Sequence, residues 1–129
     1  MVDGKTARAA FERLIAAANA KGEPDLVARA LEDDVRVERF GFHERKGQLR
    51  EVFEGAPAVA TWFQNGPWNP TTWWLEGEVR AADQGRWTVR YALEVSDFHG
   101  GGTWTAALGP SGRIAWLMHD PDDLPDDLR

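Results

Sequence analysis

The chain has 129 residues, of which 43% are hydrophobic and 28% charged, and it carries a formal net charge of −6 at pH 7. This length and composition predict one globular domain, and the acidic balance argues against nucleic-acid binding, because no basic face is available to displace counterions from a phosphate backbone. The absence of cysteine excludes disulfides, thiolate metal sites and cysteine nucleophiles.

The N-terminal segment MVDGKTARAAFERL carries charges near its start and contains no unbroken apolar run. It therefore lacks the apolar region of a secretory signal peptide. No window of the chain approaches the roughly 20 apolar residues that a membrane-spanning helix needs. These features predict a cytoplasmic protein that does not associate with membranes.

Three segments have the apolar spacing or the start signals of helices. Between Thr6 and Lys21 the apolar residues recur at intervals of three and four, which places them on one helical stripe. Pro24 suits a first helical position, and a second, shorter helix is expected from there to the acidic residues 32–34. Pro57 opens the third predicted helix, PAVATWFQN.

Alternating apolar and polar residues predict strands. In VRVERF, at 35–40, Val35, Val37 and Arg39 alternate with Arg36, Glu38 and Phe40, so this short strand has no evident inner face. Turns at Gln84-Gly85, at 99–102 and at GPSG separate four further strands: TTWWLEGEVRAAD (71–83), RWTVRYALEVSD (86–97), TWTAAL (103–108) and RIAWLMH (113–119). Residues 119–129 are expected to form an acidic, solvated C-terminal tail.

Three helices followed by long strands indicate an α+β fold in one domain spanning residues 1–129. Three motifs, AAANAKGEPDLVARALEDDVRVE, GRWTVRYALEV and GPSGRIAWLMHDPDDL, resemble the nuclear transport factor 2-like superfamily, in particular its SnoaL-like and ketosteroid isomerase-like group. The resemblance implies a cystatin-like α+β roll, in which a cone-shaped, curved antiparallel sheet wraps around three N-terminal helices. A superfold of this kind hosts enzymes, ligand binders and association modules alike.

The resemblance does not carry a known activity with it. In ketosteroid isomerase the site consists of a tyrosine on the first helix, an aspartate base closing the first strand and a protonated aspartate on the strand before the last. These positions correspond to Leu14, Arg39 and Trp104 in this chain. A shift of one residue would place Glu38 at the base position, but the two oxyanion donors would still be missing.

Tryptophan is unusually frequent, with seven Trp against one Tyr, and WFQNGPWNPTTWW at 62–74 holds four of them. On the implied fold, several of these rings face into the cone, where they would form either core or the wall of a pocket. The predicted pocket binds a hydrophobic small molecule, and its expected lining residues are Leu14, Phe40, Trp62, Trp73, Trp104 and Leu117.

The orientation of the last strand depends on the turn before it. If GPSG is a four-residue loop, Trp104 pairs with Leu117 and Gly102 with His119, and His119 faces inward, whereas a five-residue loop reverses the face. Apolarity alone favours Ile114, Trp116 and Met118 as the inner set. The register implied by the resemblance favours Ala115, Leu117 and His119, and we adopt it.

An inward His119 would be the candidate general acid and base, because imidazole exchanges protons near neutral pH. The Tyr91 hydroxyl would donate a hydrogen bond and Glu38 would supply a carboxylate, a set that suits a cofactor-free lyase, isomerase or cyclase. The alternatives are a non-catalytic module that binds a small molecule or dimerises, and a purely structural His119. The three histidines show no metal-ligand spacing, so neither a metal nor an organic cofactor is expected.

The opposite face of the sheet is predicted to carry Trp74, Ile114, Trp116 and Met118. Such an apolar patch is unusual for a monomer. We therefore expect a homodimer that packs through the outer sheet face, an arrangement that the superfamily shares. Trp68 is expected in an entrance loop beside the cone.

Overall fold

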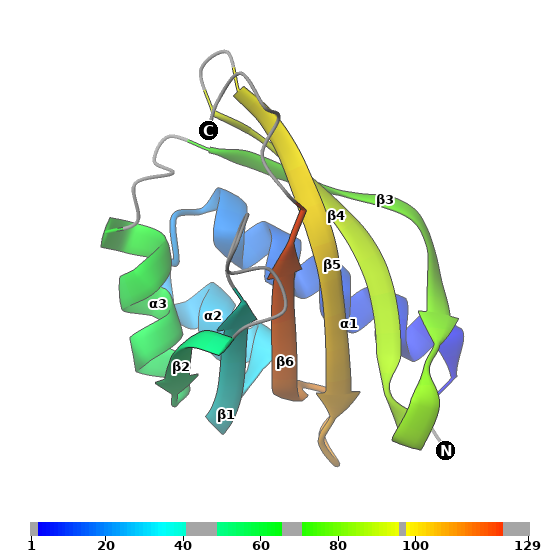
Figure 1. Cartoon of the computed structure of the whole chain (residues 1–129). Helices are drawn as coiled ribbons and strands as arrows, with labels where there is room; N and C mark the ends of the chain where they lie inside the picture. Colours follow the sequence, from blue (N-terminus) through cyan, green and yellow to red (C-terminus); the bar gives the residue numbers. More distant parts are fainter. Residues whose placement is uncertain (1–2, 41–48, 66–70, 96–97, 123–129) are drawn as a thin grey trace.

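The computed structural model describes residues 3–40, 49–65, 71–95 and 98–122, in which three helices lie against one side of a curved, six-stranded sheet (Figure 1). The helices are α1 (Gly4–Asn19), α2 (Pro24–Ala30) and α3 (Ala56–Asn65). The strands are β1 (Leu31–Phe40), β2 (Leu49–Glu54), β3 (Thr72–Ala81), β4 (Trp87–Val95), β5 (Phe98–Leu108) and β6 (Ile114–Pro121), with a short 3-10 turn η2 (Asp83–Gly85) between β3 and β4. The α+β class predicted from the sequence is confirmed.

The strand order is β2-β1-β6-β5-β4-β3. Neighbouring strands are antiparallel except for β1 and β6, which run parallel in the middle of the sheet. The sheet is therefore mixed rather than purely antiparallel. A parallel pairing requires a crossover connection, here most of the chain, so no local sequence pattern indicates it.

Helix α1 anchors the inner layer. The Asp3 carboxylate caps it by accepting a hydrogen bond from the Thr6 backbone N–H at 2.8 Å. At the other end, the Asn19 side chain accepts from the Trp73 backbone N–H and donates to the Trp73 carbonyl, at 2.7 and 2.9 Å. Asn19 thus ties α1 to β3 and fixes the strand position that carries the Trp73 ring. The buried face consists of Ala7, Ala10, Phe11, Leu14, Ala17 and Ala18.

Two strands start earlier than the sequence predicts, and one is not predicted at all. β1 begins at Leu31 and runs through the acidic residues 32–34, which were expected to be a break. β5 begins at Phe98 and includes the glycine run 100–102, which was expected to be a turn. β2 has the sequence LREVFE, in which apolar and polar residues do not alternate strictly, so it gives no strand signal of its own.

The pairing of β5 with β6 differs from the predicted register by two residues. Trp104 pairs with His119 and Gly102 with Pro121. A shift of two residues preserves the facing of every side chain, so Leu117 and His119 are buried on the inner face, the facing that we adopted.

The loop between β5 and β6 has five residues, because Leu108 pairs with Ile114 and not with Arg113. The predicted partners are wrong for two reasons that add together: the loop is one residue longer than the four-residue case, and Ala115 is an extra residue of β6 that pairs with no residue of β5. The longer loop alone would have turned His119 outward, and the bulge restores its inward facing.

This bulge also corrects the facing of Ile114. Ala107 pairs with Trp116 and Leu108 with Ile114, so one residue of β6 is skipped. Ile114 consequently turns inward and is fully buried, although the alternation of the strand placed it on the outer face. The predicted outer patch loses this member.

The segment expected to be a solvated tail begins later than residue 119. β6 continues to Pro121, and the Asp122 carboxylate accepts two hydrogen bonds from the Arg90 guanidinium, at 2.8 and 2.5 Å. Residues 119–121 are therefore part of β6, and Asp122 is bonded to Arg90 of β4. The rest of the predicted tail, 123–129, lies outside the described residues.

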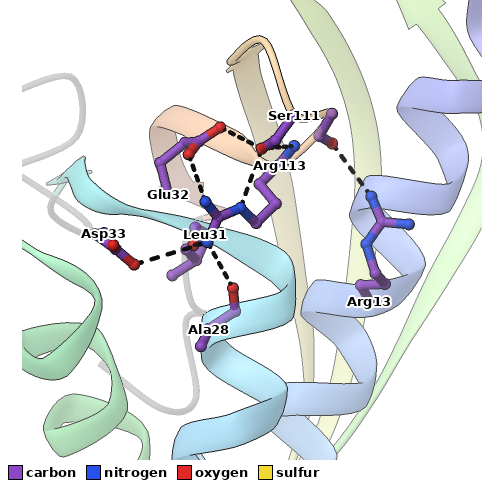
Figure 2. Close-up of polar contacts among 8 residues, drawn as sticks. Arg13, Ala28, Leu31, Glu32, Asp33, Ser111 and Arg113 are labelled. Carbon is purple, nitrogen blue, oxygen red and sulfur yellow. Dashed lines mark hydrogen bonds and ion pairs between the residues drawn. The ribbon is translucent and has the colours of Figure 1, made fainter.

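The turn between β5 and β6 is held against α2 and β1 by Arg113 (Figure 2). Its guanidinium donates to the Ala28 carbonyl at 3.0 Å and to the Glu32 carboxylate at 2.9 Å. Ser111 donates to the same carboxylate at 2.6 Å, and Arg13 of α1 donates to the Gly112 carbonyl at 3.2 Å. These contacts fix the N-terminal end of β6 relative to α1 and α2. The position of His119, near the C-terminal end of the same strand, depends on this anchor.

Candidate functional site

Six rings from α3 and four strands gather on the inner face of the sheet and are called the aromatic cluster below: Trp62, Phe63, Trp73, Tyr91, Trp104 and His119. The centroids of Tyr91 and Trp104 lie 4.8 Å apart, and those of Tyr91 and His119 lie 5.0 Å apart, with the planes of both pairs inclined by 26°. Trp73 stacks on Trp104 at 5.9 Å. The sheet positions these rings because Trp104 and His119 are directly opposite each other on neighbouring strands.

Both ring nitrogens of His119 are engaged within the cluster. The Trp104 indole N–H donates to Nδ1 at 2.9 Å, and Nε2 lies 3.1 Å from the Tyr91 hydroxyl oxygen. An indole nitrogen can only donate, so Nδ1 must present its lone pair. The neutral imidazole therefore carries its proton on Nε2 and donates it to the Tyr91 oxygen.

The environment keeps both titratable groups of this contact uncharged. Burial, assisted by the positive charge of Arg39, lowers the pKa of His119 from 6.5 to about 3. Burial, followed by the negative charges of Asp122 and Asp120, raises the pKa of Tyr91 well above its ordinary value of 10. At neutral pH the contact is thus a hydrogen bond between two neutral groups.

Arg39, and not Glu38, is the charged residue of β1 that faces the cluster. Arg39 is only 7% exposed and pairs in register with His119, and its guanidinium carbon lies 5.7 Å from the centre of the Trp62 ring. Glu38 points to the outer face, where its carboxylate accepts hydrogen bonds from the Trp116 indole and from Arg36. The expectation that Glu38 shares the cone with His119 is therefore wrong, because adjacent residues of a strand face opposite sides.

The cluster extends from the core to half-buried rings on α3. Trp104 and Tyr91 are 1% exposed, whereas Trp62 and Phe63 are half-buried. The Trp62 ring meets the edge of His119 with centroids 5.5 Å apart, and it also lies 5.5 Å from the half-buried Phe53 ring of β2. A continuous set of rings thus leads from the hydrogen-bonded imidazole to the surface beside α3.

The remaining residues proposed from the sequence lie as follows. Leu14 is fully buried and Leu117 is 3% exposed, so both pack in the core beneath the rings. Phe40 is half-buried at the end of β1. His99 is exposed, with Nε2 3.8 Å from a Glu94 carboxylate oxygen. The predicted entrance residue Trp68 and the third histidine of the chain, His43, are outside the described residues.

Sequence reasoning missed Arg39 as a site residue because a charge in VRVERF was compatible with either face. One signal was available: Arg39 shares its strand face with the apolar Val35 and Val37, and an apolar face is the one expected to point inward. It also missed Phe53, since β2 was not predicted.

On the outer face, Trp74 is 37% exposed and Trp116 and Met118 are half-buried. The Arg86 guanidinium carbon lies 4.1 Å from the centre of the Trp116 ring, and the indole N–H of Trp116 is bonded to Glu38. The outer apolar patch is therefore smaller and more polar than the sequence predicts.

No helix in the described ranges has both the length and the apolar character that crossing a membrane requires. Within the same ranges, no three His, Asp or Glu side chains gather where they could hold a metal ion.

No protein-family model matches the chain, and no curated protein is sufficiently similar in sequence to count as a relative. Solved structures do match in fold. A ketosteroid isomerase-like protein from Kribbella flavida DSM 17836 superposes with a TM-score of 0.71 at 18% identity, over 97% of this chain and 82% of that one. A SnoaL-like family protein from Agrobacterium tumefaciens str. C58 gives 0.69 at 17% identity, over 88% and 95%.

The orange carotenoid protein from Anabaena (Nostoc) sp. PCC 7120, in a structure binding canthaxanthin, gives a TM-score of 0.65 at 16% identity. The match covers 98% of this chain but 38% of the carotenoid protein. At these identities the likeness concerns the fold. Together with the three helices and the curved six-stranded sheet, it shows that the chain has the nuclear transport factor 2-like fold of the SnoaL-like and ketosteroid isomerase-like proteins, as its sequence motifs predict.

Proposed function

We propose that the protein binds a hydrophobic small molecule against the aromatic cluster, beside α3. The observation that carries this proposal is the pair of half-buried rings, Trp62 and Phe63, in direct contact with the buried rings of His119 and Trp73. An apolar ligand placed on them would remove aromatic surface from water, which contributes about 25 cal/mol per Å². The Tyr91 and His119 hydrogen bond supplies a polar group at the inner end of the cluster.

One solved structure of similar fold supports a ligand of this class. The orange carotenoid protein binds canthaxanthin, which is a long and largely apolar molecule. In this chain the proposed binding surface is built from flat rings, which offer apolar contact area at low conformational cost.

Cofactor-free proton transfer is the second candidate, as a lyase, isomerase or cyclase. It is favoured by one observation, the 3.1 Å contact between the Tyr91 hydroxyl and His119. The Tyr91 oxygen accepts a hydrogen bond from the His119 Nε2–H, so its own O–H can donate a hydrogen bond to a carbonyl of a bound molecule. Binding is the better supported of the two functions, since the lowered pKa of His119 and its two internal hydrogen bonds make the imidazole a weak base.

N-phenyl-1-naphthylamine, a neutral dye that brightens in apolar surroundings, tests the binding proposal directly. We expect saturable binding, and Trp62→Ala should weaken it by about five- to tenfold, since an aromatic contact and its buried area are worth about 1 kcal/mol or more. Trp62 is half-buried, so the variant is expected to fold. The matched control is Trp74→Ala, which removes an indole from the outer face and should leave the affinity unchanged. Fluorescence titration measures both. Equal affinities in the two variants would contradict the proposed site.

We further propose that two copies associate through the outer sheet face. The 37% exposed indole of Trp74 supports this arrangement, with Met118 and Trp116 half-buried on the same face. Light scattering at micromolar concentration should give twice the chain mass of 14.4 kDa, and Trp74→Glu should shift the mass toward a single chain. A mass of one chain for the unmodified protein would rule the dimer out.

A further inference from the structure

Arg39 places a positive charge beside the uncharged rings of Trp62 and His119. The side chain is 9% exposed, and its guanidinium lies over Trp62 and influences His119 electrostatically. Burying a cation is costly unless partners compensate it. Within the described ranges its guanidinium makes one hydrogen bond, from Nη1 to the Glu51 carboxylate. None of its nitrogens is among the fully buried polar atoms that lack a partner in those ranges.

We infer that Arg39 binds the anionic group of the ligand, so that the hydrophobic molecule is an organic acid such as an aromatic or alicyclic carboxylate or sulfonate. The inference rests on the proposed function and specifies its ligand class. A planar guanidinium with donors to spare is suited to a carboxylate or a similar oxyanion. The hydrocarbon part of the same molecule would lie on Trp62, whose ring already contacts the guanidinium and the imidazole.

A purely structural role explains Arg39 less well. Its partner Glu51 lies on the edge strand β2 and its side chain is 42% exposed, so water can hydrate this carboxylate if a ligand anion takes its place. The neighbouring Arg36 shows what a surface arginine of the same strand looks like. It points outward, is 46% exposed and forms ion pairs with Glu38 and Glu54. An apolar side chain would fill the position of Arg39 without the cost of burying a charge.

Two dyes with one skeleton separate the anion from the hydrocarbon. 8-Anilinonaphthalene-1-sulfonate is N-phenyl-1-naphthylamine with an added sulfonate. We expect the sulfonate dye to bind about tenfold more tightly at low ionic strength, as a charge-assisted contact of this kind adds roughly one to two kcal/mol. Arg39→Met should abolish this preference, measured as the ratio of the affinities of the two dyes for the same variant. Glu51→Gln should raise the affinity for the sulfonate dye several-fold, because the guanidinium loses its competing carboxylate. Arg36→Met is the matched control and should change neither affinity.

The outcomes distinguish this inference from the proposal beneath it. If the neutral dye binds but the sulfonate dye is not preferred, or if the preference survives Arg39→Met, the inference is overturned and hydrophobic binding stands. If neither dye binds, the proposed function fails, and the inference with it. If Arg39→Met does not fold, the test rests on Glu51→Gln. An affinity of Glu51→Gln for the sulfonate dye equal to that of the unmodified protein would then overturn the role of Arg39.

Discussion

Gly102→Ala is expected to lower the free energy of unfolding by about 3 kcal/mol, the upper part of the usual range for overpacking a buried site. A Cβ atom at Gly102 would lie 2.5 Å from the Asp120 carbonyl oxygen and 2.7 Å from the Pro121 Cα, both backbone atoms of β6 that cannot move aside without disrupting the strand pairing. It would also lie 2.5 Å from the Tyr91 hydroxyl. Chemical denaturation followed by tryptophan fluorescence measures the loss.

The control for this prediction is Thr103→Ala in the next position of β5. Its side chain is on the outer face, where it accepts a hydrogen bond from Arg90, and its loss should cost less than about 1 kcal/mol. Equal stabilities of Gly102→Ala and the unmodified protein would show that β5 and β6 are less closely packed than described. Because the added methyl group also displaces the Tyr91 hydroxyl, a folded Gly102→Ala protein should bind the neutral dye more weakly.

Acidification is expected to destabilise the protein through His119. Its folded-state pKa of about 3 lies below the unfolded value near 6.5, so between these two values only the unfolded chain takes up the proton. The stability that comes from keeping His119 neutral in the folded state is fully present above about pH 6.5, and it is lost as the pH falls toward about 3. Between pH 7 and pH 5 this single group should remove about 2 kcal/mol of stability. Urea denaturation at pH 7, 6 and 5 measures the slope.

Two histidine variants isolate that slope. His119→Gln should reduce it over this range, although the protein will be less stable at every pH because its contacts with Trp104 and Tyr91 change. His99→Gln alters an exposed imidazole and should keep the slope of the unmodified protein. Identical slopes in all three proteins would mean that His119 is not held neutral by burial.

The same His119 variant separates the two candidate functions once a ligand is known. An enzyme that uses this imidazole would lose turnover and retain ligand binding. A binding protein would have no turnover to lose, and the variant would change affinity alone.

The strands and their facings could be predicted where periodicity was strict. In WTVRYALEV every second residue is apolar, and Tyr91 faces inward in the structure. The inward facing of His119 was also predicted, but the four-residue loop assumed for it is wrong: the loop has five residues, and the bulge at Ala115 offsets the extra residue.

The parts that failed depend on contacts made by distant segments. Glu38 and Arg39 could each have faced inward from VRVERF alone, and the choice became clear only once Arg39 was seen beside Trp62 of α3. Gly102 was interpreted as a turn residue, whereas its role is to leave room for Tyr91 and β6. Ile114 changed sides because of a bulge that apolar alternation does not reveal. The fold class required none of these details, which is why it could be recognised from the order of elements. Most rings of the aromatic cluster were also predicted, but its charged member Arg39 was not.

The position of β6 between β1 and β5 has a consequence for biosynthesis. As a nascent chain leaves the ribosome, β1 and β2 can pair with each other, and β3, β4 and β5 can form a meander, but the two groups share no hydrogen-bonded neighbour until β6 emerges. Until then two unpaired strand edges remain open, which is the condition under which chains associate wrongly and chaperones intervene. Since His119 lies on β6, the aromatic cluster is completed only after this strand has joined the two groups.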